Sequence, residues 1–157
     1  MKKKANAKPA PKATAADAQI VLHLYDMRRE PVMREARGYM TGKFFPRSAD
    51  EIAKLHNDFG SKENAYYRQV MTYWEQSASL VRHSAVNDSL FNAWAAEMHF
   101  LWAKFQPYIE DLRKQINSPG YLKNIESICE GTPANRERRI NTQASIRVRF
   151  MKEEASA

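Results

Sequence analysis

The sequence predicts an all-α fold: a bundle of about five helices with a central antiparallel helix pair and flexible basic tails. Two observations lead to this. Only 5 of 157 residues are glycine, which argues against a turn-rich β fold, while 43% of the residues are hydrophobic and can fill a core. The second is an apolar seam that steps alternately by three and four residues, as a long helix requires. It comprises Phe91, Trp94, Met98, Leu101, Phe105, Tyr108 and Leu112.

The chain divides by composition into one domain and two tails. Residues 1–16 contain almost only Lys, Ala and Pro, and we expect them to be a disordered basic tail. Residues 17–131 form the single helical domain. Residues 132–157 form a second basic tail that we expect to be mostly disordered, although "SIRVRFM" alternates like a strand that could pair with a partner.

A proline interrupts the first predicted helix. Asp17 is a plausible N-cap, and apolar residues follow it at helical spacing. Pro31 lacks a backbone N–H, so the helix must either kink there or end near Arg29 and begin again. We favour a new helix with Pro31 in its first turn, because the apolar stripe changes phase at this point.

Two further helices follow in close succession. Ser48 with Glu51 three residues later is typical of a capping box, and Gly60 suits the end of that helix. Ser61 then caps a long helix that reaches about His83. Its apolar stripe at spacings of three or four comprises Tyr67, Val70, Trp74, Ala78 and Val81.

The seam helix begins at its N-cap, Asn87. Pro107 leaves the phase of the seam intact, which predicts one long helix bent near Ala103, whose carbonyl loses its partner. This helix should pack antiparallel against the helix from Ser61, because the connection between them is short. A last helix should take Ser118 as its cap and end at Gly131.

Four arginines flank the proline in "YDMRREPVMREAR", and they are the one candidate binding site for an anion or a partner. These are Arg28, Arg29, Arg34 and Arg37. Gathered around a helix N-terminus, they could hold an anionic group. The alternative is the solvated outer face of an ordinary helix. The sequence leaves both open.

No catalytic, cofactor or metal constellation stands out. The chain has no Glu-x-x-His, no His-x-x-x-His and one cysteine, Cys129, which we expect to be a packed thiol. His23, Asp26 and Glu30 form the one compact titratable cluster, and catalysis there is a minor hypothesis. We therefore expect a nonenzymatic protein without a cofactor or metal.

The expected partners follow from the aromatic excess and from the charge distribution. More aromatic residues are present than one seam can hide, which favours a groove for a partner helix or for another copy of the chain. Residues 18–130 hold 14 basic and 14 acidic side chains, so any nonspecific contact with nucleic acid would come from the basic tails. No apolar run is long enough to span a membrane, and we expect a cytoplasmic protein.

One long segment resembles a known group of proteins. An aromatic-Trp-Glu helix is followed by Leu-Val, a turn, Leu-Phe, a Trp, then Pro-x-Ile and an Arg. The residues concerned are Trp74, Glu75, Leu80, Val81, Leu90, Phe91, Trp102, Pro107, Ile109 and Arg113. The pattern resembles an uncharacterised bacterial all-helical family of unknown function. The resemblance implies a helical, bacterial, noncatalytic domain and names no reaction. The long seam, the aromatic excess and the missing catalytic constellations favour an interaction or regulatory domain.

Overall fold

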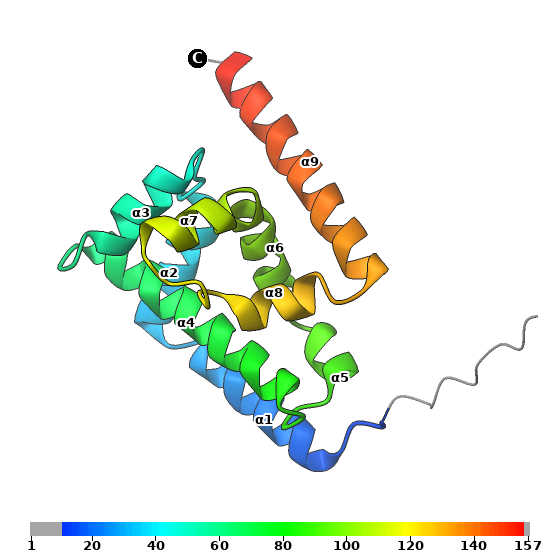
Figure 1. Cartoon of the computed structure of the whole chain (residues 1–157). Helices are drawn as coiled ribbons and strands as arrows, with labels where there is room; N and C mark the ends of the chain where they lie inside the picture. The colour runs from blue at the N-terminus through cyan, green and yellow to red at the C-terminus, as the bar shows by residue number, and fades with distance from the viewer. Residues whose placement is uncertain (1–10, 156–157) are drawn as a thin grey trace, which may run out of the picture.

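A computed structural model describes residues 11–155, and the side chains of residues 11–148 (Figure 1). Every regular element in this part of the chain is a helix, as predicted. The helices are α1 (Ala15–Met27), α2 (Pro31–Gly42), α3 (Ala49–Asn57), α4 (Lys62–Arg82), α5 (Asp88–Asn92), α6 (Ala96–Phe105), the 3₁₀ helix η1 (Gln106–Tyr108), α7 (Ile109–Gln115), α8 (Lys123–Cys129) and α9 (Pro133–Ala155).

α1 begins earlier than predicted because its N-cap is Thr14. The Thr14 hydroxyl accepts from the Asp17 amide at 3.2 Å, and the Asp17 carboxylate accepts from the Thr14 amide at 2.7 Å. Asp17 is therefore the third residue of a capping box. It also accepts from the Asn87 amide at 2.8 Å and so joins the starts of α1 and α5. Of the tail predicted over residues 1–16, residues 1–10 lie outside the described residues, whereas Pro11 accepts a hydrogen bond from Asn87.

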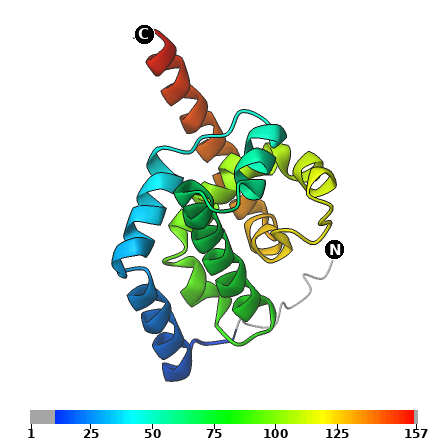
Figure 2. The same cartoon turned by 90° about the vertical axis from the view of Figure 1, so that its left-hand side faces the viewer.

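The predicted restart at Pro31 is confirmed. α1 ends at Met27 and Pro31 is the first residue of α2. The Glu30 carboxylate accepts from the amides of Val32 and Met33 at 3.1 and 2.7 Å, which satisfies donors at the new N-terminus. α1 and α2 follow one another along one side of the molecule (Figure 2).

The caps predicted for α3 and α4 are confirmed as well. The hydroxyls of Ser48 and Ser61 accept from the third residue beyond them, at 3.2 and 3.0 Å. Gly60, between the two helices, has φ +103°, a left-handed conformation that side chains rarely adopt. After this turn, α4 runs for 21 residues without a break, as its apolar stripe predicts.

The prediction of one long helix over the seam was wrong. Asn87 caps only the short α5, a turn follows at residues 93–95, and Pro107 lies in η1 between α6 and α7. Without an N–H on Pro107 the carbonyl of Ala103 loses its helical partner, as expected. Gln143 of α9 donates to that carbonyl at 3.1 Å. The seam is still turned inward: all its members are buried except Trp94 and Tyr108, which are partly buried.

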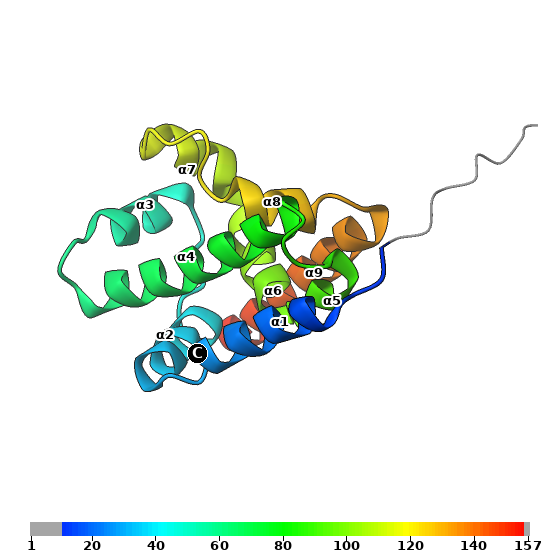
Figure 3. The ribbon, with the colours of Figure 1, turned by 90° about the horizontal axis from the view of Figure 1, so that it is seen from below.

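The predicted central pair also differs from the structure. α4 lies between α2 and α8, its closest neighbours, rather than along the seam helices (Figure 3). The turn at residues 93–95 directs α6 towards α9, α8 and α2. Large aromatic side chains make contacts between α4 and the seam residues. The ring centroids of Trp74 and Phe91 are 6.4 Å apart, and those of Tyr67 and Phe105 are 6.1 Å apart.

α8 begins five residues after the predicted cap at Ser118, because a distant side chain caps it. Leu122 precedes the helix in a left-handed conformation, with φ 56°, and makes no side-chain cap. The Glu75 carboxylate of α4 instead accepts from the amides of Asn124 and Ile125 at 2.9 and 3.0 Å. A carboxylate at a helix N-terminus is favoured by the helix dipole.

The expectation of a mostly disordered tail over residues 132–157, or of a strand at "SIRVRFM", was wrong for the described part. Residues 133–155 form α9, which packs on α6. Arg139 pairs with Glu130 at 2.7 Å and Gln143 reaches Ala103, so polar contacts fasten a helix whose apolar residues have no clear period.

Replacing Glu75 with Ala should remove the cap of α8 and lower the free energy of unfolding by about 1–2 kcal/mol, as the loss of a helix N-cap does. The measurement is urea unfolding followed by circular dichroism. Gln76→Ala, an exposed neighbour on the same helix, is the control. Equal stabilities of the two variants would show that Glu75 does not hold α8.

Candidate functional site

The four predicted arginines do not form one site. Arg28 and Arg37 both bind Glu97 of α6, with N–O distances of 3.1 and 2.8 Å. Arg29 pairs with Asp26 at 3.5 Å on the surface. Arg34 is exposed on α2. Two of the arginines therefore satisfy an internal carboxylate, and the other two belong to the solvated face that the sequence left as the alternative.

Glu97 is the centre of a polar cluster inside the fold. Its carboxylate also accepts from the indole N–H of Trp74 at 3.0 Å. The guanidinium carbon of Arg28 lies 5.1 Å from the ring centroid of Trp74 and 5.6 Å from that of Trp94, so aromatic faces hold the cation beside the acid. The cluster joins the end of α1 to α2, α4 and α6.

The surroundings of the Glu97 carboxylate favour its ionised form. Burial raises the pKa of Glu97, but the hydrogen bond from Arg37 and the positive charge of Arg28 outweigh it, so that the pKa lies below its ordinary value. Only 10% of its side chain is exposed, against 11% for Arg28 and 28% for Arg37. Its three donors come from the body of the protein, which makes the cluster a structural one.

The cluster of His23, Asp26 and Glu30 does not assemble as a catalytic group. Glu30 accepts from the α2 backbone and Asp26 pairs with Arg29. His23 is exposed on α1. Glu30 and Asp26 therefore face different partners, and the minor catalytic hypothesis has no support from the geometry.

A histidine–tyrosine cluster that the sequence did not indicate lies beside α4. The phenol groups of Tyr67 and Tyr121 are hydrogen bonded to each other, and His56 Nδ1 is 3.5 Å from the Tyr67 oxygen. Burial raises the pKa of both phenols. Burial, with the nearby charge of Arg68, lowers the pKa of His56. The residues come from α3, α4 and the segment before α8, so local spacing gave no signal.

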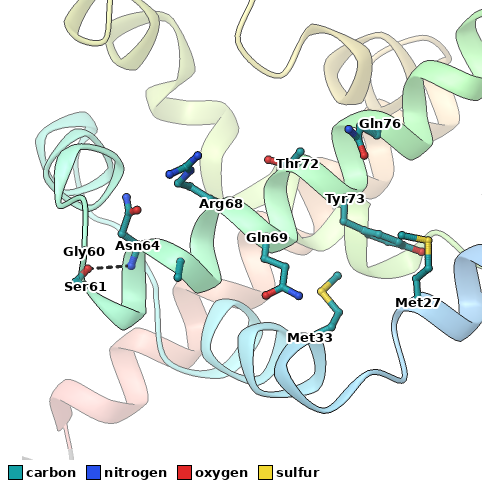
Figure 4. A pocket seen from close by; sticks show the side chains of 11 residues that line it. Met27, Met33, Gly60, Ser61, Asn64, Arg68, Gln69, Thr72, Tyr73 and Gln76 are labelled. Atoms are coloured by element: carbon teal, nitrogen blue, oxygen red, sulfur yellow. Dashed lines mark hydrogen bonds between the residues drawn. The ribbon is translucent and has the colours of Figure 1, made fainter.

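The outer face of α4 carries an exposed polar row with a hollow on each side. Arg68, Thr72 and Gln76, four residues apart, form this row, which we call the α4 ridge, and all three line both hollows. The first hollow, of about 620 Å³, lies between α4 and α1–α2 (Figure 4). The second, of about 320 Å³, lies between α4 and the segment 118–122.

Apolar side chains contribute to the walls of both hollows. Met27 and Met33 line the first, and the buried Met71 and Leu122 line the second. Tyr73 also lines the first, and its phenol donates to the carbonyl of Leu24 at 2.8 Å. Polar side chains outside the ridge, among them Asn64 and Gln69, also line the first hollow, so its surface is mixed.

Arg68 is held at one end of the ridge by an exposed aromatic ring. Its guanidinium carbon lies 5.7 Å from the ring centroid of Phe59, whose exposed fraction is 69%. Among the side chains of residues 11–148, no carboxylate lies within ion-pairing distance of Arg68. A guanidinium can contact an aromatic ring and still donate hydrogen bonds to a carboxylate.

The described residues offer no metal centre and no membrane-spanning helix. No three His, Cys, Asp or Glu side chains within residues 11–148 come together as metal ligands would. None of the helices in residues 11–155 combines the length and apolar character needed to cross a bilayer. Cys129 is buried, as expected for a packed thiol, and burial raises its pKa.

The comparisons with known proteins give one match. The model of a family described as "Domain of unknown function (DUF4760)" matches residues 13–132, a range that contains the Glu97 cluster and the α4 ridge and ends before α9. No curated protein and no solved structure matches the chain.

Glu97→Gln should lower the free energy of unfolding by about 3 kcal/mol at neutral pH, because Arg28 would keep a buried charge without its counter-ion. Because the pKa of Glu97 is lowered by folding, its contribution is present above the unfolded value of about 4.3 and is lost as the pH falls through the folded one. The deficit of the variant should therefore shrink at about pH 3.

Urea unfolding at both pH values measures this deficit. Asp111→Asn, which breaks an exposed pair with Lys114, is the control and should change little. A Glu97→Gln protein as stable as the wild type at neutral pH would show that the cluster is not structural.

Proposed function

This chain belongs to the DUF4760 family of domains of unknown function, and we propose that it is a noncatalytic interaction domain that binds another protein through the α4 ridge and its hollows. The observation that carries the proposal is the pair of hollows that share one exposed polar row. We further propose a bacterial cytoplasmic setting, supported by the family resemblance and by a single, buried cysteine.

The shape of the first hollow favours a peptide segment over a compact small molecule. Its lining runs along α4 from Ser61 to Gln76, which at 1.5 Å per residue is about 22 Å. In Figure 4, Gln69 and Tyr73 point from α4 towards Met33 and Met27, and Arg68, Thr72 and Gln76 lie on the other side of the α4 ribbon. A groove of several helical turns between apolar and polar edges suits an amphipathic helix laid along it.

The chemistry of this hollow favours binding over catalysis. The residues that line it include no Asp, Glu, His, Cys or Lys. Tyr73 donates to a backbone carbonyl, and the Asn64 amide donates to the carbonyls of Leu55 and His56. A general base would need a titratable group within reach of a substrate, whereas the lining supplies amides, the hydroxyls of Ser61 and Thr72, the hydrogen-bonded phenol of Tyr73 and one guanidinium.

A photoreactive amino acid at Thr72 should form a covalent adduct with the partner, whereas the same residue at Ser89, exposed on α5, should not. After mass spectrometry identifies the partner in the adduct, the affinity of the purified partner for the chain can be measured. Thr72→Trp, which obstructs both hollows, should weaken binding at least tenfold, and Ser89→Trp should not. Equal adducts from both positions, or unchanged affinity of Thr72→Trp, would refute the proposed interface.

Nonspecific nucleic-acid association is a second candidate, favoured by the exposed arginines of α9. Arg136, Arg138 and Arg147 are exposed on this helix, and five lysines lie within residues 1–12. Replacing Arg136 and Arg138 with Gln and deleting residues 1–10 should weaken binding to duplex DNA and flatten its salt dependence, because fewer counterions are released. Fluorescence anisotropy at several salt concentrations measures both. Unchanged affinity and slope would exclude this candidate.

A further inference from the structure

Building on the proposed function, we infer that the partner presents an acidic amphipathic helix whose carboxylate binds Arg68, while its apolar side chains enter the hollows beside the α4 ridge. The charge of the ridge, its neighbours and the place of Arg68 between two apolar walls carry this inference.

Arg68 is the one charged residue of the ridge, and among the side chains of residues 11–148 no carboxylate lies within ion-pairing distance of it. The other two members, Thr72 and Gln76, are neutral. Three other arginines of this fold meet carboxylates: Arg28 and Arg37 meet Glu97, and Arg113 meets Glu126 at 3.0 Å. The Arg68 guanidinium contacts the exposed ring of Phe59, and its fork of N–H donors suits the carboxylate of a ligand.

The one acidic residue that lines either hollow is already committed. Glu75 lines the second hollow, but its two oxygens accept from the amides of Asn124 and Ile125 and from the Asn124 side chain at 2.8–3.0 Å. It therefore serves the N-terminus of α8 and does not neutralise the ridge. A cationic partner would find no uncommitted acceptor of full charge there, whereas an anionic one finds Arg68.

The position of Arg68 sets where the acid must lie in the partner. Because Arg68 lines both hollows, a carboxylate bound to it lies between the two apolar walls. The walls are Met27 and Met33 on one side and Met71 and Leu122 on the other. Methionine side chains adapt to differently shaped apolar groups. On a partner helix, residues three and four apart share a face, so an acid flanked by apolar residues at those spacings satisfies all three contacts.

The test uses a library of helical peptides on a fixed scaffold, displayed on phage and selected on the full chain. Selected peptides should be enriched in Asp or Glu flanked by apolar residues at spacings of three or four. Arg68→Glu in the chain should lower the affinity of these peptides at least tenfold. Replacing the Asp or Glu of the peptide with Lys should restore its binding to that variant. Arg82→Glu, the same charge change near the end of α4, is the control and should leave affinity unchanged.

The remaining outcomes separate this inference from the proposed function. Some selected peptides could lose binding to the Thr72→Trp variant and yet lack an acidic residue, or bind the Arg68→Glu variant as tightly as the wild type. Either result would overturn the inference and leave the proposed interface intact. If Thr72→Trp blocks no selected peptide, both are overturned. If the chain forms a dimer and Arg68→Glu abolishes it, the ridge binds a second copy of the chain. That result would overturn the inference of a separate partner protein. Circular dichroism of each variant verifies that it remains folded.

Discussion

The fold is organised around one carboxylate whose side chain is only 10% exposed. Glu97 on α6 receives Arg28 from the end of α1, Arg37 from α2 and Trp74 from α4, so four separate helices meet at a single charged group. Desolvating such a group is costly, and the cost is offset only while every donor stays in place. The arrangement therefore fixes how the α1–α2 corner sits against α4. Because the corner also supplies Met27 and Met33, the same contact sets one wall of the first hollow.

Polar side chains from distant parts of the chain complete helices that cannot complete themselves. Glu75 supplies the N-cap that α8 lacks, and Gln143 takes the carbonyl that Pro107 leaves unpaired. Buried backbone groups need partners, and here α4 and α9 supply them to α8 and α6. The result is an α4 held firmly on its inner side by α2 and α8. A rigid helix of this kind can present the exposed ridge of Arg68, Thr72 and Gln76 to a partner with little loss of conformational freedom on binding.

Much of the local structure could be predicted from the sequence, because caps and prolines act over a few residues. Ser48, Ser61 and the restart at Pro31 are where the sequence places them, and the apolar seam is turned inward. The candidate site was predicted less well. The arginines at 28 and 37 were singled out for an external anion, but they bind an acid 69 and 60 residues away. The sequence does not indicate Arg68 as a site residue, since nothing in its local spacing distinguishes it from other arginines on solvated helix faces.

The sequence by itself determined the all-helical class, the long α4 and the inward phase of the seam, since each follows from hydrogen bonding and side-chain periodicity within a few turns. Only the tertiary structure decided that the seam breaks at residues 93–95, that α4 lies between α2 and α8, and that residues 133–155 form a packed helix. Those outcomes depend on which distant groups become available as partners. A periodic pattern states which face of a helix is apolar, but the matching donors, acceptors and surfaces are brought together only when the whole chain folds.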